Sequence, residues 1–233
     1  MRNFSIRVLG SGLLILGAAL AFVGCGGATP TTPTASVDPL AHLEAGRAHQ
    51  QAGDLDKAIA ELEAAVQADP TLTEAHFRLG NAYTEGGQLD KAAEEFKAVL
   101  GLDANDADAH SNLGVVYYQK GLLPEAASEF RAALDISPED AEVHYLLGAA
   151  YVPMQRLDEG VKEFNAALEY NPDLPEAHFG LGMVYKLQGN TEEAIKAFER
   201  FLELGPVQDL DPGQRGAGDE NACGLDRRPA GHR

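Results

Sequence analysis

A repeat of 34 residues runs through most of this sequence and limits what it can fold into. The related segments TEAHFRLG, ADAHSNLG, AEVHYLLG and PEAHFGLG begin at residues 73, 107, 141 and 175. The histidines of these segments keep the interval, and His42 lies one step before them, so five of the seven histidines share one register. Repeats of this length are typical of solenoids, whose units bury their apolar faces only by stacking. The histidines fit either a metal or proton site or a repeated packing position.

Length, composition and charge define the broad class of the protein. The chain has 233 residues, and 45% of them are hydrophobic, which is enough to bury a core. The formal net charge of −18 disfavours nucleic acid as a partner, because the phosphates would be repelled. Two cysteines, Cys25 and Cys223, are too few for a disulfide framework. We therefore expect a folded acidic protein with no nucleic-acid partner.

The N-terminal residues predict export. MRNFSIR carries two arginines and no acid, and the run from Val8 to Val23 has 16 uncharged residues. A helix that spans a membrane needs about 20. The run fits the apolar region of a secretory signal peptide better, so residues 1–24 are predicted to be a signal peptide.

The end of this run resembles the lipobox of bacterial lipoproteins. Phe22, Val23 and Gly24 precede Cys25, although Phe22 stands where leucine is usual. The resemblance implies cleavage before Cys25 and acylation of its thiol, for example with palmitate. It places the protein in the bacterial cell envelope, on the outer membrane or the outer face of the cytoplasmic membrane. The alternative is ordinary signal-peptide cleavage with Cys25 as an incidental residue. Residues 25–38 are rich in Gly, Thr and Pro and predict a tether.

Each 34-residue unit predicts two short antiparallel helices, because a helical apolar period is interrupted by glycine and proline at the same places. Counted from the first residue of a unit, the recurring residues are Leu79-Gly80, Leu113-Gly114, Leu147-Gly148 and Leu181-Gly182 at positions 7 and 8, Tyr83, Tyr117, Tyr151 and Tyr185 at position 11, Ala58, Ala92, Ala126 and Ala194 at position 20, Phe96, Phe130, Phe164 and Phe198 at position 24, and Pro70, Pro138, Pro172 and Pro206 at position 32. This pattern resembles the tetratricopeptide repeat (TPR) family.

The resemblance implies an all-α fold, a right-handed α-solenoid of five helix-turn-helix units with a concave inner surface. The predicted units are 39–72, 73–106, 107–140, 141–174 and 175–206, and residues 207–233 form an irregular tail. Small residues at positions 8 and 20 are expected where the two helices of a unit cross closely. The fourth unit departs from the pattern at Pro153, Gln155 and Gly160, so its hairpin is expected to be the least regular.

The histidines at position 4 share the helix face of the leucine at position 7, which points into the packing seam. A zinc ion needs its nitrogen ligands about 2 Å away. Equivalent side chains on stacked helices are about 8–10 Å apart and point in parallel. The histidines are therefore interpreted as packing residues that Phe or Tyr could replace with little loss of stability, and no metal or other cofactor is expected.

The resemblance also indicates where a ligand would bind, because the first helix of each TPR unit presents positions 2, 5, 6, 9, 12 and 13 to the concave groove. The groove residues predicted in this way are Phe77, Arg78, Asn81, Asn112, Val115, Tyr118, Tyr145, Phe179, Met183 and Lys186. Asn81 and Asn112 match the asparagine pair by which chaperone-binding members of the family hold an extended peptide, and solvated helix surface is the alternative. Their carboxylate clamp is absent, since Phe77, Glu142 and Leu146 replace the cations.

Acidic residues recur at position 2 of successive units, as Glu74, Asp108, Glu142 and Glu176. An acid in the first turn of a helix is stabilised by the helix dipole, which is sufficient to explain them. If they also face a ligand, that ligand is neutral or basic.

The sequence contains no HExxH, P-loop or GxSxG motif, so catalysis is not expected. The expected function is a non-catalytic scaffold or adaptor that binds other proteins, with pilotins and adaptors of cell-wall enzymes as the specific candidates. The alternative is a self-associating envelope protein. In that case the apolar residues Ile195, Phe198 and Leu202 of the last predicted helix would form the contact, because no capping helix is predicted after them.

Overall fold

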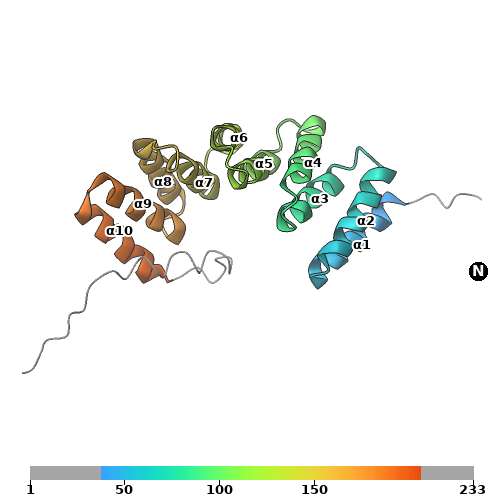
Figure 1. Ribbon diagram of the computed structural model, residues 1–233, viewed down its shortest axis with the longest axis horizontal. Helices are drawn as coiled ribbons and strands as arrows, with labels where there is room; N and C mark the ends of the chain where they lie inside the picture. The colour runs from blue at the N-terminus through green and yellow to red at the C-terminus, as the bar shows by residue number, and fades with distance from the viewer. Residues whose placement is uncertain (1–37, 206–233) are drawn as a thin grey trace, which may run out of the picture. The chain divides into compact units, whose positions relative to one another are not determined.

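The computed structural model describes residues 38–205, which contain ten α-helices and no strand (Figure 1). The helices are α1 (Pro39–Ala52), α2 (Leu55–Ala68), α3 (Thr73–Glu85), α4 (Leu89–Leu102), α5 (Ala107–Gln119), α6 (Leu123–Ile136), α7 (Ala141–Tyr151), α8 (Leu157–Tyr170), α9 (Pro175–Gln188) and α10 (Thr191–Leu204). The predicted signal peptide, the tether up to residue 37, Cys25, Cys223 and the tail 207–233 lie outside the described residues. Within them, no helix is both long and apolar enough to span a membrane.

The helix ends follow local residue chemistry. The side chain of Asp38 accepts a hydrogen bond from the backbone N–H of Leu40, so the last residue of the predicted tether caps α1. Asp106 and Asp140 cap α5 and α7 in the same way. The hairpin between α1 and α2 turns at Gly53, whose φ of 75° lies in the left-handed region that glycine adopts without strain.

The two helices of each unit cross closely at the glycine of position 8. A Cβ atom added at Gly80 would lie 2.9 Å from the ring of Phe96, and one added at Gly114 would lie 2.7 Å from the ring of Phe130. Both phenylalanines are almost completely buried. The aromatic side chain at position 24 therefore packs directly on the glycine backbone of the other helix, as the sequence predicted.

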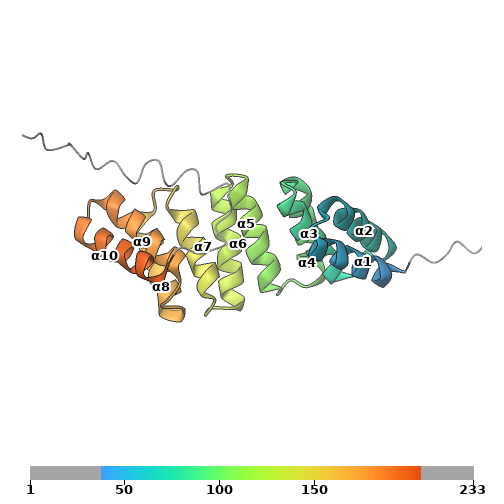
Figure 2. The ribbon, with the colours of Figure 1, turned by 90° about the horizontal axis from the view of Figure 1, so that it is seen from below.

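The units stack in chain order (Figure 2). Each even-numbered helix packs against the odd-numbered helix that follows it. The odd-numbered helices also lie beside one another, α3 with α5, α5 with α7, and α7 with α9. Closer approach on one side of a stack makes that side concave, so these helices line the inner face. The predicted α-solenoid of five helix-turn-helix units is confirmed for the described residues.

The fourth unit is the least regular, as predicted. Helix α7 ends at Tyr151 after 11 residues, two before the end expected from α3 and α5, each of which has 13. Gln155 takes the place of the turn glycine and has a φ of 60°, the one positive φ of a non-glycine residue in the described chain. The cause is Pro153, which cannot donate a backbone hydrogen bond to continue the helix.

Candidate functional site

The inner face is organised around Tyr145 on α7. Burial raises the pKa of its hydroxyl, and the neighbouring groups Glu176, Tyr118 and Glu142 raise it further. Tyr118 belongs to α5, Glu142 to α7 and Glu176 to α9. Side chains of three successive odd-numbered helices thus lie near enough for their charges to act on one hydroxyl. We call the surface formed by Tyr118, Tyr145, Phe179, Met183 and Lys186 together with Glu142 and Glu176 the α5–α9 groove.

The predicted groove residues of the third to fifth units provide its apolar surface. Tyr118 is 40% exposed, Phe179 46% and Met183 38%. Two aromatic rings of α10 pack against Phe179 and restrict its orientation: its ring centroid lies 5.7 Å from that of Phe198 and 5.3 Å from that of Phe201. Exposed aromatic rings with fixed orientation are the side chains that most often dominate the energy of protein–protein contacts.

Other predicted groove residues are engaged within the fold. Phe77 packs edge-on against Phe96, with ring centroids 5.8 Å apart, and is partly buried. Val115 is partly buried against the core cluster of α6 and α7. The Nε of Arg78 donates to Oε1 of Glu74 one turn earlier, at 2.8 Å. These residues of the second and third units have less surface to offer a ligand than the α5–α9 groove.

The two asparagines of the predicted pair differ in availability. Asn81 is partly exposed on α3. The Nδ2 of Asn112 donates to the backbone carbonyl of Asp108 at 2.9 Å, which leaves one N–H and the Oδ1 atom for a ligand. Asn112 lies in a shallow polar pocket between the first turns of α5 and α7, lined also by Asp108, Ser111, Asp140, Glu142 and Val143.

The α5–α9 groove is acidic. The charges of Glu142 and Glu176 both raise the pKa of the Tyr145 hydroxyl, and Lys186 is an exposed cation on α9. Among the described residues, the Oε2 atom of Glu176 is buried without a hydrogen-bond partner. No donor within the described part of the fold compensates this oxygen, so the carboxylate of Glu176 adds negative charge to the α5–α9 groove and favours a cation nearby.

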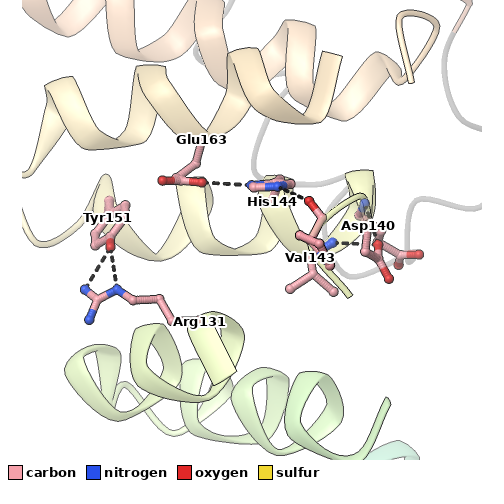
Figure 3. Close-up of polar contacts among 8 residues, drawn as sticks. Arg131, Asp140, Val143, His144, Tyr151 and Glu163 are labelled. Atoms are coloured by element: carbon pink, nitrogen blue, oxygen red, sulfur yellow. Dashed lines mark hydrogen bonds and ion pairs between the residues drawn. The ribbon is translucent and has the colours of Figure 1, made fainter. Parts of the chain in front are cut away.

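The histidines of position 4 form a repeated hydrogen-bonded bridge. In the second unit, Nδ1 of His76 lies 2.6 Å from Oε2 of Glu95 on the other helix of the unit. Its Nε2 lies 3.0 Å from the carbonyl oxygen of Pro70, which belongs to the preceding unit. His144 repeats the arrangement with Glu163 at 2.8 Å and Pro138 at 3.1 Å (Figure 3). The imidazole therefore joins both helices of its unit to the preceding unit.

This bridge corrects the interpretation of the histidines as simple packing residues. The sequence reasoning missed their glutamate partners, Glu61, Glu95, Glu129 and Glu163. The signal was present, because each glutamate follows its histidine by 19 residues, and only the fifth unit breaks the spacing with Ala197. Among the described residues, no group of three or more His, Cys, Asp or Glu side chains could hold a metal ion.

A larger pocket lies between α6, α7 and α8. Arg131 on α6 donates from both Nε and Nη2 to the hydroxyl of Tyr151, at 3.0 and 2.8 Å (Figure 3). The guanidinium of Arg156 lies 4.5 Å from the centroid of the same ring. The charged residues that line the pocket are Arg131, Asp135, Glu159, Lys162 and Glu163. Glu159 pairs with Arg156, and Glu163 pairs with His144, so this pocket is interpreted as a junction between units and carries no ligand assignment.

The repeats of this chain match models of a known protein family. A family model described as TPR repeat matches residues 46–85, 80–121 and 116–155. A second model, described as Tetratricopeptide repeat, matches residues 145–209. A comparison with curated protein sequences gave no match.

Solved structures with the same fold include several TPR proteins. A structure of MamA is 26% identical, with a TM-score of 0.65 over 74% of this chain and 96% of that protein. YrrB, described as a TPR protein with an unusual peptide-binding site, is 21% identical, with a TM-score of 0.62 over 75% of this chain and 90% of its own. PilF from Pseudomonas aeruginosa is 22% identical, with a TM-score of 0.65 over 72% of this chain and 77% of its own. The last two likenesses show the fold alone.

Proposed function

This chain belongs to the tetratricopeptide repeat family, and we propose from this that it is a non-catalytic scaffold that binds an extended peptide or a helix of another protein in its α5–α9 groove. The TPR fold is typical of protein–protein interaction. The position of the binding surface within the fold rests on the residues of this chain.

One observation carries the proposal: Tyr118, Tyr145 and Glu176 come from three successive odd-numbered helices, and the first and last lie near enough to Tyr145 to raise the pKa of its hydroxyl. Their proximity creates a continuous surface that crosses unit boundaries, which an extended segment can follow. Tyr118 and Phe179 add exposed aromatic area on either side of Tyr145. Aromatic anchors beside groups that pair with a peptide backbone are the usual elements of peptide recognition.

The chemistry of the groove favours a neutral or basic ligand. A lysine or arginine side chain of the ligand would be attracted by the carboxylates of Glu142 and Glu176 and could pack its cation against a neighbouring tyrosine ring. An acidic segment would meet Glu142 and Glu176 and be repelled.

We further propose that the scaffold is held at the bacterial envelope by acylation of Cys25. The support is the apolar leader and the lipobox-like residues before Cys25 in the sequence. Within this setting, the specific candidates remain a pilotin-like protein and an adaptor of cell-wall enzymes. YrrB is described as binding peptides, and its low identity leaves that property as an analogy for this chain.

An affinity capture from envelope extracts tests the groove. The protein is the bait in one arm, and a variant with Tyr118, Tyr145 and Asn112 all replaced by alanine is the bait in the other. A second variant serves as a matched control, with Leu102→Ala and Ile136→Ala, because these side chains are 45% and 38% exposed near the ends of α4 and α6. We expect the triple variant to lose a partner that the wild type and the control variant both retain. A partner retained equally by all three baits would place the binding surface elsewhere.

A further inference from the structure

The outer face of α10 exposes side chains at two repeat positions that are buried or partly buried in every preceding unit. Position 28 is Leu202 in the fifth unit, and this side chain is 71% exposed. The same position is partly buried in the core in each earlier unit, as Val66, Leu100, Leu134 and Leu168. Position 21 shows the same difference in exposure, since Ile195 in the fifth unit is 51% exposed whereas Ala93 and Ala127 in the second and third units are buried. In the earlier units this face packs against the first helix of the next unit.

The outer face of α1 exposes the other half of the same junction. Ala41 and Ala48, at positions 3 and 10, are exposed. In the other four units these positions are 0–5% exposed, with Ala75, Ala109, Val143 and Ala177 at position 3 and Ala82, Val116, Ala150 and Val184 at position 10. Position 7, a buried leucine in those units, is the smaller Ala45 in α1. The two ends of the array therefore present complementary apolar faces, one with protruding side chains and one with small ones.

A polar contact of the internal junctions supports the same pairing. The residue at position 25 touches the residue at position 11 of the next unit: the hydroxyl of Tyr83 donates to Glu63, Arg131 donates to Tyr151, and Lys97 lies 5.6 Å from the ring centroid of Tyr117. At the ends of the array, position 25 is Glu199 and position 11 is His49. A carboxylate opposite an imidazole that can donate an N–H is a favourable pair.

From these three observations we infer that copies of this chain associate head to tail, with the outer face of α10 in one copy packed against the outer face of α1 in the next. The contact repeats the geometry that already joins α2 to α3, α4 to α5, α6 to α7 and α8 to α9. It is heterologous, because it joins two different surfaces, and such contacts build open chains of copies when the rotation does not close. A single helix-to-helix junction is small, so the association depends on concentration.

Sedimentation analysis of the purified protein over a concentration series tests the inference. We expect the average mass to rise with concentration and to pass the mass of a dimer. Leu202→Glu places a charge on the α10 face, and Ala48→Glu places one on the α1 face. Each should keep the protein monomeric, because a charge at a packed junction is not compensated. Leu187→Glu is the matched control, since Leu187 is 57% exposed on α9 outside both faces, and it should associate like the wild type.

A mixture of the two blocked variants distinguishes head-to-tail association from other arrangements. The intact α10 face of the Ala48→Glu protein can pair with the intact α1 face of the Leu202→Glu protein, so a 1:1 mixture should form a two-copy complex and nothing larger. If two α10 faces paired with each other, Ala48→Glu would associate like the wild type and the mixture would gain nothing. That result would overturn the inference. So would a wild type that stays monomeric at every concentration, for example because residues outside 38–205 cover one of the faces. Matching far-ultraviolet circular dichroism and urea unfolding of all variants establish that the substitutions at these exposed sites leave the fold intact.

Discussion

The Nδ1 atom of His76 lies 2.6 Å from Oε2 of Glu95, and this pair joins the two helices of the second unit while Nε2 bonds to the unit before it. The side chains are well covered, with 9% of His76 and 19% of Glu95 exposed. A hydrogen bond to a charged group in such a place contributes more to stability than one at the surface.

Replacing this histidine with an aromatic ring of similar size tests the bridge. We expect His76→Phe to lower the free energy of unfolding by about 1–3 kcal/mol, because Glu95 and the carbonyl of Pro70 lose their partner. The measurement is urea unfolding. His178→Phe is the matched control, since among the described residues His178 bonds to the carbonyl of Pro172, and Ala197 stands 19 residues after it where the other units have a glutamate. Equal small effects at both sites would restore the interpretation of packing alone.

Two glycines of the fourth unit are expected to respond oppositely to alanine. A Cβ atom at Gly160 would meet its nearest neighbour, the carbonyl oxygen of Gly148, at 3.5 Å, an ordinary contact, so Gly160→Ala should raise the free energy of unfolding by about 0.5–1 kcal/mol. A Cβ atom at Gly148 would lie 2.9 Å from the ring of Phe164, so Gly148→Ala should be destabilising. Thermal and urea unfolding of the two variants decide the matter, and a loss of stability at Gly160 would contradict the assigned packing.

Alkaline pH should destabilise the array through Tyr83. Burial and the hydrogen bond to Glu63 raise the pKa of its hydroxyl above the ordinary 10.0. The folded state thus favours the neutral phenol, whose contribution to stability is complete below about pH 10 and is lost as pH rises further toward the folded-state pKa. Above that pH, the urea concentration at the midpoint of unfolding should decrease. It should decrease less steeply for Tyr83→Phe than for the wild type. An identical pH profile for the variant and the wild type would exclude Tyr83 as the cause.

In the groove, Tyr145 is expected to be an energetic anchor for the partner. Tyr145→Ala should weaken binding of a captured partner by about 1–3 kcal/mol, the usual range for an aromatic anchor. Titration calorimetry measures the loss, and urea unfolding checks that the array remains folded. Tyr145→Phe keeps the ring and separates its packing from its hydroxyl. An unchanged affinity for the alanine variant would move the binding surface away from the α5–α9 groove.

The proposed anchor has its own test at Cys25. We expect Cys25→Ser to abolish incorporation of labelled palmitate and to reduce the membrane-bound fraction, because acyl chains provide the stable attachment. The readouts are metabolic labelling and membrane fractionation, and Cys223→Ser is the control because it leaves the lipobox-like residues intact. Labelling that persists in Cys25→Ser, or membrane partition that does not change, would count against lipidation at this residue.

The sequence by itself determined the architecture of this protein. A 34-residue period with glycine at position 8 and an aromatic residue at position 24 is sufficient to predict paired helices that stack, because only small residues allow the backbone approach seen between Gly80 and Phe96. It also predicted the irregular hairpin at Pro153, since a proline limits the backbone regardless of its surroundings. These are local or periodic constraints, and they can be seen without knowing which helices touch.

Only the tertiary structure decided which side chains remain available and which are paired. Phe77 and Phe179 occupy the same repeat position, yet Phe77 is partly buried against Phe96 whereas Phe179 is 46% exposed. Likewise, His76 and His178 share a repeat position, yet His76 has a glutamate partner, Glu95, whereas the described hydrogen bond of His178 is to a backbone carbonyl. A repeat pattern assigns the same role to every equivalent position. Availability and pairing instead depend on the particular side chains brought across from neighbouring helices, and these differ from one unit to the next.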